Sequence, residues 1–570
     1  MSQAYPRLIA GLPARAPASA AMPSSAAMPS SVRQMQTQIG QLPLANPAVA
    51  ARELTRLLQG MLGTVWPGGE RLEALQALGA TVMQLCNGAE RQLATESFPL
   101  PPAKLALAES VSAFQRMLAQ GYALAAYEMC APTGKVRFMR GKSVLQALLS
   151  ALHYGGLDLL WRYRLYRTPQ PDSWLRLHAA YAFARDCALA DKEAALDDAN
   201  TRRTPRALYL HALLLAVSNP YRFSGRELND AWEVTGLMVA RCTLESSASS
   251  AIAIDPASDA GPGYLPEERR ASIPGLLSFD AEPAREALAA DQRMQPGGAT
   301  RLSYRMGDGR VLEVTHTFLE RLQSTWGGAA ERGHARLPAG HPLETCIGLH
   351  GVHMLLAGGQ PFQSFLSGLR GAAVAQDTQS TSPAWAAADS GGVLVQRVKV
   401  IDQSLGGYQL LWQAEAGLRM RVGEIVGLAP LAERGDVQDW MIGIVRWMRI
   451  EDSGQIDSGI ELLARQALPA AVRFPDAGGT LHNPQRALLL RDGNGERLLL
   501  AVLGEAMPRA LELSLPEDPR DWQPTPGVRM GHVESSEPIG PSYISLTVNA
   551  APRAAAVDAP TQSTPEPAHD

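Results

Sequence analysis

The chain has 570 residues, an apolar fraction of 46%, a charged fraction of 19% and a formal net charge of −4 at pH 7. A chain of this length is too long for one hydrophobic core, so several domains are predicted. The nearly balanced charge excludes a general electrostatic attraction of the whole chain to nucleic acid or anionic lipid. The five cysteines form no CxxC or Cys/His pattern, which indicates reduced thiols in the cytosol. We therefore expect a cytoplasmic protein without a membrane span.

The N-terminal part is predicted to be helical after a disordered tail. Residues 1–47 are rich in Ala, Pro and Ser and contain the doubled unit "AAMPSSAAMPSS". Over 48–244, apolar residues recur at spacings of three and four between Pro/Gly breaks, as in "RLEALQALGATVMQLCNGAERQL". This periodicity predicts a helical bundle or a repeat-like array. The arginines of "LWRYRLYR" would spread around a helix, so we interpret this stretch as a solvated amphipathic helix and not as a nucleic-acid contact.

The sequence pattern changes from helical periodicity to short β-type runs after residue 244. The polar, small-residue stretch "ESSASSAIAIDPASDAGPG" predicts a linker and irregular segment over 245–300, and "VLEVTHTFLERLQSTWGG" predicts one further helix. Short runs rich in Val, Ile, Trp and Tyr, separated by Gly/Asp/Ser turns, then predict a small antiparallel barrel. We place this barrel domain at 301–475 with an insertion near 345–392, a second small β module at 476–550 and a disordered tail at 551–570. The predicted fold class is multidomain α+β.

One turn in the barrel region carries an unusual set of residues. In "VIDQSLGGYQLLW", Asp402, Ser404, Gly406 and Gly407 lie between two predicted strands. Glycines let the backbone take positive φ or approach a ligand closely, and an acid with a hydroxyl suits nucleotide recognition. The same residues also suit an ordinary β-turn with an Asx-type aspartate. Both interpretations remain open on turn chemistry alone.

The barrel region resembles the PilZ domain, the family of cyclic di-GMP receptors. The family signature is RxxxR followed by [D/N]xSxxG at the end of a strand, and Asp402-Gln-Ser404-Leu-Gly-Gly407 fits the second motif at every fixed position. The stretch "WMIGIVRWMRI…SGIELL" is similar to the family's later strands. The match to RxxxR is Arg332-Gly-His-Ala-Arg336, although it lies several times farther from Asp402 than is usual in the family.

The resemblance implies a non-catalytic receptor for cyclic di-GMP. Arginine pairs bidentately with phosphate or with guanine O6/N7 and stacks on the base, so Arg332 and Arg336 would clamp the ligand. Asp402, Ser404 and Gly407 would hold its second face, and Arg397 is a further candidate in the strand that leads to Asp402. The helical domain would engage an unidentified protein partner. The alternative is a degenerate PilZ-like barrel that binds no nucleotide and acts as a protein-interaction scaffold.

Other constellations are weaker. The stretch Arg140–Ser143, "RGKS", resembles the end of a phosphate-binding loop but lacks the required upstream glycine, so we interpret it as a helix N-terminus. His350 and His353 have no acidic or cysteine partner at a metal-binding spacing, so no metal is expected. No motif pairs a nucleophile with a base. We therefore expect no enzyme, no cofactor besides the ligand cyclic di-GMP, and no nucleic-acid partner.

Overall fold

The computed structural model describes residues 3–16, 29, 31–196, 202–246, 250–270, 272–294, 301–328, 335–370, 393–415, 417–431, 439–476, 479–492, 495–502, 509–516 and 527–552. The chain divides into two compact units. A helical unit comprises 1–335 together with 447–457, and a β unit comprises 336–446 and 458–570. This α+β architecture is the one predicted from the sequence.

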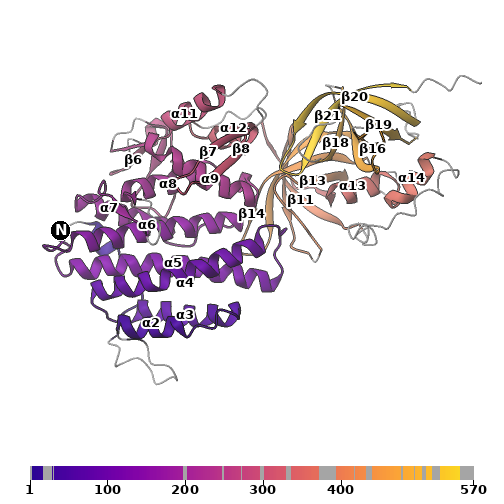
Figure 1. Ribbon diagram of the computed structural model, residues 1–570. Coiled ribbons are helices and arrows are strands. Elements are labelled where there is room, and N and C mark those ends of the chain that lie inside the picture. The colour runs from indigo at the N-terminus through magenta and orange to yellow at the C-terminus, as the bar shows by residue number, and fades with distance from the viewer. Residues whose placement is uncertain are drawn as a thin grey trace, which may run out of the picture. The chain divides into compact units, whose positions relative to one another are not determined.

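The helical unit is built on a stack of long helices (Figure 1). The helix α5 (Pro102–Cys130) packs along α4 (Gly68–Leu93) and α6 (Gly141–Arg164). The remaining helices of this unit are α1 (Ala4–Arg7), α2 (Val32–Gly40), α3 (Pro47–Gly63), α7 (Ser173–Asp186), α8 (Pro205–Val217) and α9 (Gly225–Met238). The helices α1 and α2 correct the prediction of a disordered tail over 1–47, because their buried Tyr5 and Met35 pack in this unit. Several begin where capping chemistry predicts, since Asn46 and Thr204 each cap a helix with proline at its first position and Ser224 forms a capping box.

The segment 245–335 differs from the prediction of a linker over 245–300 and a barrel domain that begins at 301, because all of it belongs to the helical unit. A four-stranded sheet is formed by β3 (Thr243–Glu245), β4 (Ile252–Ile254), β5 (Gly263–Tyr264) and β6 (Leu277–Asp280). The segment also contains the short helix α10 (Glu267–Arg270), the helix α11 (Glu282–Arg293), the hairpin of β7 (Arg301–Arg305) and β8 (Val311–Thr315), and the helix α12 (His316–Gln323). The expected helix begins only at His316, because Thr315 caps it and the β-branched run before it pairs as a strand. Buried Phe279 and Trp326 add this segment to the helical unit, and Trp326 Nε1 donates to Ser218 Oγ at 2.9 Å.

A buried ion pair ties three helices of this unit together. Arg71 on α4 is fully buried, and its Nε and Nη2 donate to the two carboxylate oxygens of Glu128 on α5 at 2.7 and 2.8 Å. The same guanidinium donates to the backbone carbonyls of Met61 and Thr64 at the end of α3. The Arg71 side chain therefore pairs with a partly buried carboxylate and also donates to carbonyls at a helix C-terminus that have no partner within the helix.

The helix α6 is buried on most of its surface, which corrects the expectation of a solvated amphipathic helix. Arg162 is only 3% exposed, and Arg167 donates to Glu109 at 2.7 Å. On the same helix Asp158 is also buried and accepts a hydrogen bond from Ser112 Oγ at 2.7 Å. Burial raises the pKa of Asp158 from 3.8 to about 6.

Asp158→Asn is expected to become more favourable relative to the wild type as the pH rises. Because the pKa of Asp158 is higher in the folded chain than in the unfolded chain, its stabilising effect is complete below about pH 4 and is lost as the pH rises through about 6. The difference in unfolding free energy between variant and wild type should shift by on the order of 2 kcal/mol between about pH 4.5 and 7.5. Denaturant unfolding at both pH values measures it, and a pH-independent difference would contradict the raised pKa.

The β unit contains two closed barrels (Figure 1). The first is closed by β10 (Pro342–Ile347), β11 (Val395–Ser404), β12 (Gly407–Trp412), β13 (Ile425–Pro430), β14 (Met441–Ile450) and β15 (Ile456–Ala464), with β9 (Leu337–Pro338) added on β11. The second is closed by β16 (Gln466–Arg473), β17 (Gln485–Asp492), β18 (Gly495–Ala501), β19 (Ala510–Leu515), β20 (Gly527–Pro538) and β21 (Tyr543–Pro552). The helices α13 (Leu349–Leu356) and α14 (Phe362–Arg370) lie in the segment predicted as an insertion.

The two barrels share one strand order. If the six strands of each barrel are numbered in chain order, their order around the ring is first, second, third, sixth, fifth and fourth in both barrels. The second module is therefore a complete barrel of the same topology, and it begins at Gln466, ahead of the predicted boundary at 476. The second barrel has a core that includes Leu489, Leu498 and Leu513. Ile442 and Ile444 of the first barrel pack in a separate cluster with residues of the second barrel, among them Leu488 and Leu499.

Several sequence features have structural roles. Among the described residues, no helix has both the length and the hydropathy that crossing a bilayer requires. All five cysteines are free thiols. The "RGKS" stretch begins α6, as predicted for a helix N-terminus. His353 is buried on α13 with Nε2 3.2 Å from the Ala470 carbonyl oxygen, and burial lowers its pKa to about 4.

Candidate functional site

The candidate site is built around the hairpin that joins β11 and β12. Ser404 lies opposite Gly407, and Asp402 lies opposite Gln409. The Ser404 hydroxyl donates to the Gly407 carbonyl oxygen at 3.4 Å, which closes the turn. Leu405 at the tip is exposed. The turn therefore presents its polar residues close to one end of the first barrel.

A bulge in β11 sets the direction of the Asp402 side chain. Val400 is buried and lies opposite Leu410, whereas Asp402 lies opposite Gln409, with a register shift between Val400 and Asp402. Because Gln409 and Leu410 are consecutive on a strand, they face opposite sides of the sheet. Asp402 consequently points to the outer face, where a regular strand would have turned it toward the core.

The strand β9 brings the second arginine of the RxxxR match to this aspartate. Pro338 pairs with Asp402 and Leu337 with Gln403 in antiparallel register. Arg336 directly precedes β9, and its Nη1 donates to Asp402 Oδ1 at 2.6 Å although the two residues are 66 positions apart in the chain. Their side chains are 37% and 22% exposed, so both remain accessible to a ligand. Arg332 lies outside the described residues.

Arg397 does not join this pair. It lies on the exposed side of β11 opposite Glu344, five residues before Asp402, which corresponds to ~16 Å along a strand. Lys399 is exposed on the same strand and closer to Asp402. Gln409, directly opposite Asp402, is a further polar neighbour that sequence reasoning missed. The two-residue hairpin at Leu405-Gly406 would have revealed it, because the hairpin fixes the register of β12 against β11.

Gly407 is required by packing as well as by the turn. A Cβ at this position would lie 2.0 Å from the backbone carbonyl oxygen of Ile460 on β15. The neighbouring Gly406 carbonyl accepts a hydrogen bond from Leu462 N at 2.9 Å. The glycine of the DxSxxG motif therefore fixes the hairpin against the next strand of the barrel, and this role is independent of any ligand.

Gly407→Ala is expected to destabilise the first barrel by on the order of 2–3 kcal/mol, because the Ile460 carbonyl is backbone and must move to admit the methyl group. Gly340→Ala is the matched control, since a Cβ there meets no atom within 4 Å. Denaturant unfolding of both variants measures the effect. Equal stability of the two variants would show that the hairpin relaxes without cost.

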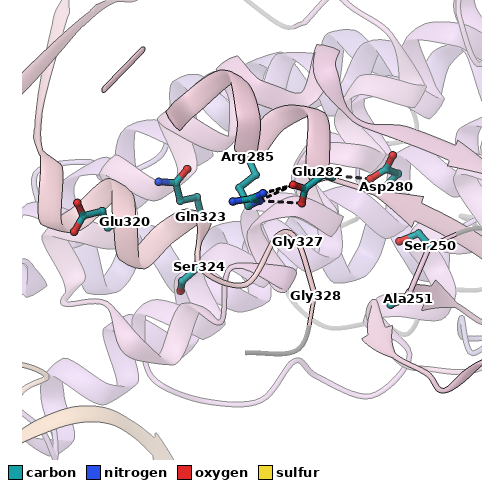
Figure 2. Close-up of a pocket in the computed structure, with 10 residues that line it drawn as sticks. All are labelled: Ser250, Ala251, Asp280, Glu282, Arg285, Glu320, Gln323, Ser324, Gly327 and Gly328. Atoms are coloured by element: carbon teal, nitrogen blue, oxygen red, sulfur yellow. Dashed lines mark hydrogen bonds and ion pairs between the residues drawn. The ribbon is translucent and has the colours of Figure 1, made fainter. Parts of the chain in front are cut away.

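A further hollow lies elsewhere, in the helical unit. It has a volume of about 750 Å³ and is lined by acidic Asp280, Glu282 and Glu320 (Figure 2). Its one cation, Arg285, is paired to Glu282. Excess negative charge disfavours a phosphate ligand there, so the outer face of β11 is the better candidate for nucleotide recognition.

Two family models match this chain. The family model described as "Cyclic-di-GMP receptor FimW, N-terminal domain" matches residues 31–249, and the one described as "Cyclic-di-GMP receptor FimW, middle PilZ domain" matches 251–396 and 386–469. The second match includes both motifs and the first barrel. Residues 251–469 therefore contain a PilZ domain.

A characterised relative resembles most of the chain. The chain is 26% identical over 504 residues to the cyclic-di-GMP receptor FimW of Pseudomonas aeruginosa strain PAO1, an alignment that covers 79% of this chain and 80% of the relative. The similarity extends through the helical region and through the segment predicted as a linker, beyond the part of the sequence that resembled the PilZ family by its motifs.

Proposed function

We propose that this protein is a non-catalytic receptor for cyclic di-GMP and that the ligand binds on the outer face of β11. The observation that carries the proposal is the ion pair between Arg336 and Asp402, which joins the two halves of the PilZ signature across 66 positions. The name of the relative, a cyclic-di-GMP receptor, supports the choice of ligand.

The proposed binding step exchanges one pairing for another. Arg336 turns its guanidinium from Asp402 to a phosphate or to guanine O6/N7, and Arg332 supplies the second arginine of the clamp. Asp402 is then released to accept hydrogen bonds from the N–H edge of a guanine. Ser404 contributes a hydroxyl near the turn, and Arg397 and Lys399 add positive charge along β11 toward the dianionic ligand.

The second barrel is not part of the proposed site. Its topologically matching hairpin joins Asp492 to Gly495, and the position that corresponds to Asp402 holds Leu490, which is buried. Arg497 and Arg491 beside this hairpin are already paired with Asp492 and Glu496. At the matching position of the hairpin, the first barrel therefore has the outward carboxylate of Asp402, whereas the second barrel has a buried leucine.

Signal output is proposed to pass through the helical unit to a protein partner. The tip of the β14–β15 hairpin, 447–457, is part of that unit, where Ile450 N donates to the Tyr166 carbonyl oxygen at 2.7 Å. The strand β15 also packs against Gly407 through Ile460. Ordering of the arginine segment around a ligand shifts the output only as far as the ligand prefers the ordered state.

Isothermal titration of the full chain with cyclic di-GMP tests the proposal, with GTP and cyclic GMP as controls. Saturable binding that is specific to the dinucleotide is the expected result. Absence of heat with well-folded protein would overturn the receptor function and favour the scaffold alternative. The packing role of Gly407 supports that alternative, because it accounts for part of the motif without a ligand.

A further inference from the structure

The loop between α5 and α6 carries two adjacent and unusually exposed apolar side chains. Phe138 is 95% exposed and Met139 is 87% exposed, which makes them the two most exposed large hydrophobic residues in the described part of the chain. Single exposed apolar residues are ordinary on protein surfaces. Two neighbours that both project fully from one loop are not explained by folding, because they contribute almost no burial.

The same loop is strongly basic. Lys135, Arg137, Arg140 and Lys142 surround the two apolar side chains, and no Asp or Glu occurs between Glu128 and Asp158. Within the described residues, no carboxylate forms an ion pair with any of these four cations, in contrast to the many paired arginines elsewhere in the helical unit. We call residues 135–142 the basic apolar tip.

The tip is held outward by its base. Gly134 is buried against the ring of Tyr5, so closely that a Cβ would lie 2.8 Å from the ring. Arg137 Nη2 donates to the Ala131 carbonyl oxygen at 2.6 Å, a neutral partner that leaves the positive charge uncompensated. Met139 has a φ of 64°, a left-handed conformation that non-glycine residues adopt at a cost. A fixed turn therefore presents the apolar pair to solvent.

We propose that the basic apolar tip docks the protein on the surface of an anionic phospholipid bilayer. The projecting side chains of Phe138 and Met139 can be buried only in a partner that accepts them. A bilayer interface accepts apolar side chains below the headgroups without a preformed pocket. Anionic headgroups attract the four cations around the pair. One surface therefore complements both properties of the tip, whereas a protein partner would have to supply a matching pocket ringed by acids.

The contact is weak and reversible. Two side chains bury less apolar surface than a lipid chain, and even a single lipid chain alone binds a membrane only marginally and reversibly. Binding consequently requires anionic lipid and decreases with salt, because the electrostatic attraction is screened over about 10 Å at 0.1 M ionic strength. The inference does not depend on the proposed nucleotide site, since the tip lies on the helical unit and contains none of the residues assigned to that site.

Flotation of the purified full chain with vesicles tests the inference, without nucleotide and without any other protein. Vesicles of phosphatidylcholine with about one third phosphatidylglycerol are expected to bind the protein, and pure phosphatidylcholine vesicles to bind it at least about tenfold less. Binding to the anionic vesicles should fall several-fold at ~0.5 M salt.

Variants at the tip separate its two components. Phe138→Asp/Met139→Asp is expected to reduce vesicle binding at least about tenfold, and Met294→Asp, at an 85% exposed methionine on the same unit, leaves it unchanged. Lys135→Gln/Lys142→Gln should weaken binding several-fold, whereas Lys192→Gln/Arg241→Gln, which removes two exposed cations elsewhere, should not. Equal binding by the tip variant and wild type, or no binding of wild type to anionic vesicles, would overturn the proposal and favour a protein partner for the tip.

Discussion

Replacing Arg336 by alanine is expected to raise the dissociation constant for cyclic di-GMP by about 10- to 100-fold. The substitution removes the guanidinium that pairs with Asp402 in the free protein and that would donate charge-assisted hydrogen bonds to the ligand, each contributing about 1.5–3 kcal/mol. Arg336→Lys should recover only part of the affinity, because lysine keeps the charge but lacks the planar fork. Titration calorimetry measures all three proteins.

The matched control is Arg446→Ala. Arg446 is an arginine of the same β unit with similar exposure, and it pairs with Glu461 at 2.8 Å. Its removal should change the affinity by less than about threefold, within the effect of a surface ion pair. If Arg336→Ala bound the nucleotide as tightly as Arg446→Ala, the site would not lie on the outer face of β11, even though wild-type binding would keep the receptor function.

Arg71→Ala is expected to cause the largest loss of stability of any single substitution considered for the helical unit. It leaves Glu128 partly buried without its bidentate partner and removes the donors to the Met61 and Thr64 carbonyls. Breaking a buried pair from one side costs about 3–5 kcal/mol, which corresponds to a fall in melting temperature on the order of 10 °C. Arg15, with its Nε 4.0 Å from Glu128, compensates for only a small part.

Two further variants isolate the cause. Arg56→Ala removes a half-buried arginine that pairs with the more exposed Glu53 at 3.0 Å, and it should cost less than about 1 kcal/mol. Arg71→Met/Glu128→Leu removes both buried charges and should be more stable than Arg71→Ala alone. Thermal unfolding followed by helical circular dichroism compares them. A double variant less stable than Arg71→Ala would show that the carbonyl contacts, and not the unpaired carboxylate, carry the loss.

Periodicity and motif predicted much of this molecule, and the failures have common causes. The helices from α3 to α9 and the strands from β11 to β15 are long or strongly patterned, and both were found. The sheet of β3–β6 was missed because its strands have at most four residues and pair over long distances, so no local period marks them. The burial of Arg162 was missed for a related reason, since tertiary packing around α6 decides it.

The candidate site was predictable in its residues but not in its geometry. The DxSxxG residues identify the turn. The outward direction of Asp402 depends on a bulge between Val400 and Asp402, which no residue type in the strand indicates. The approach of Arg336 depends on β9, a strand of only two residues. Closure of the second barrel and its shared strand order likewise follow from pairings between distant segments.

The pairing of β9 with β11 has a consequence for how such receptors are recognised in genomes. Hydrogen bonds between neighbouring strands, and not the number of intervening residues, set the distance between the arginine and the aspartate. Material inserted between the two strands, here including β10, α13 and α14, can lengthen or shorten without moving the two side chains apart. A search pattern that prescribes a short spacer between the two motifs would therefore overlook proteins built this way.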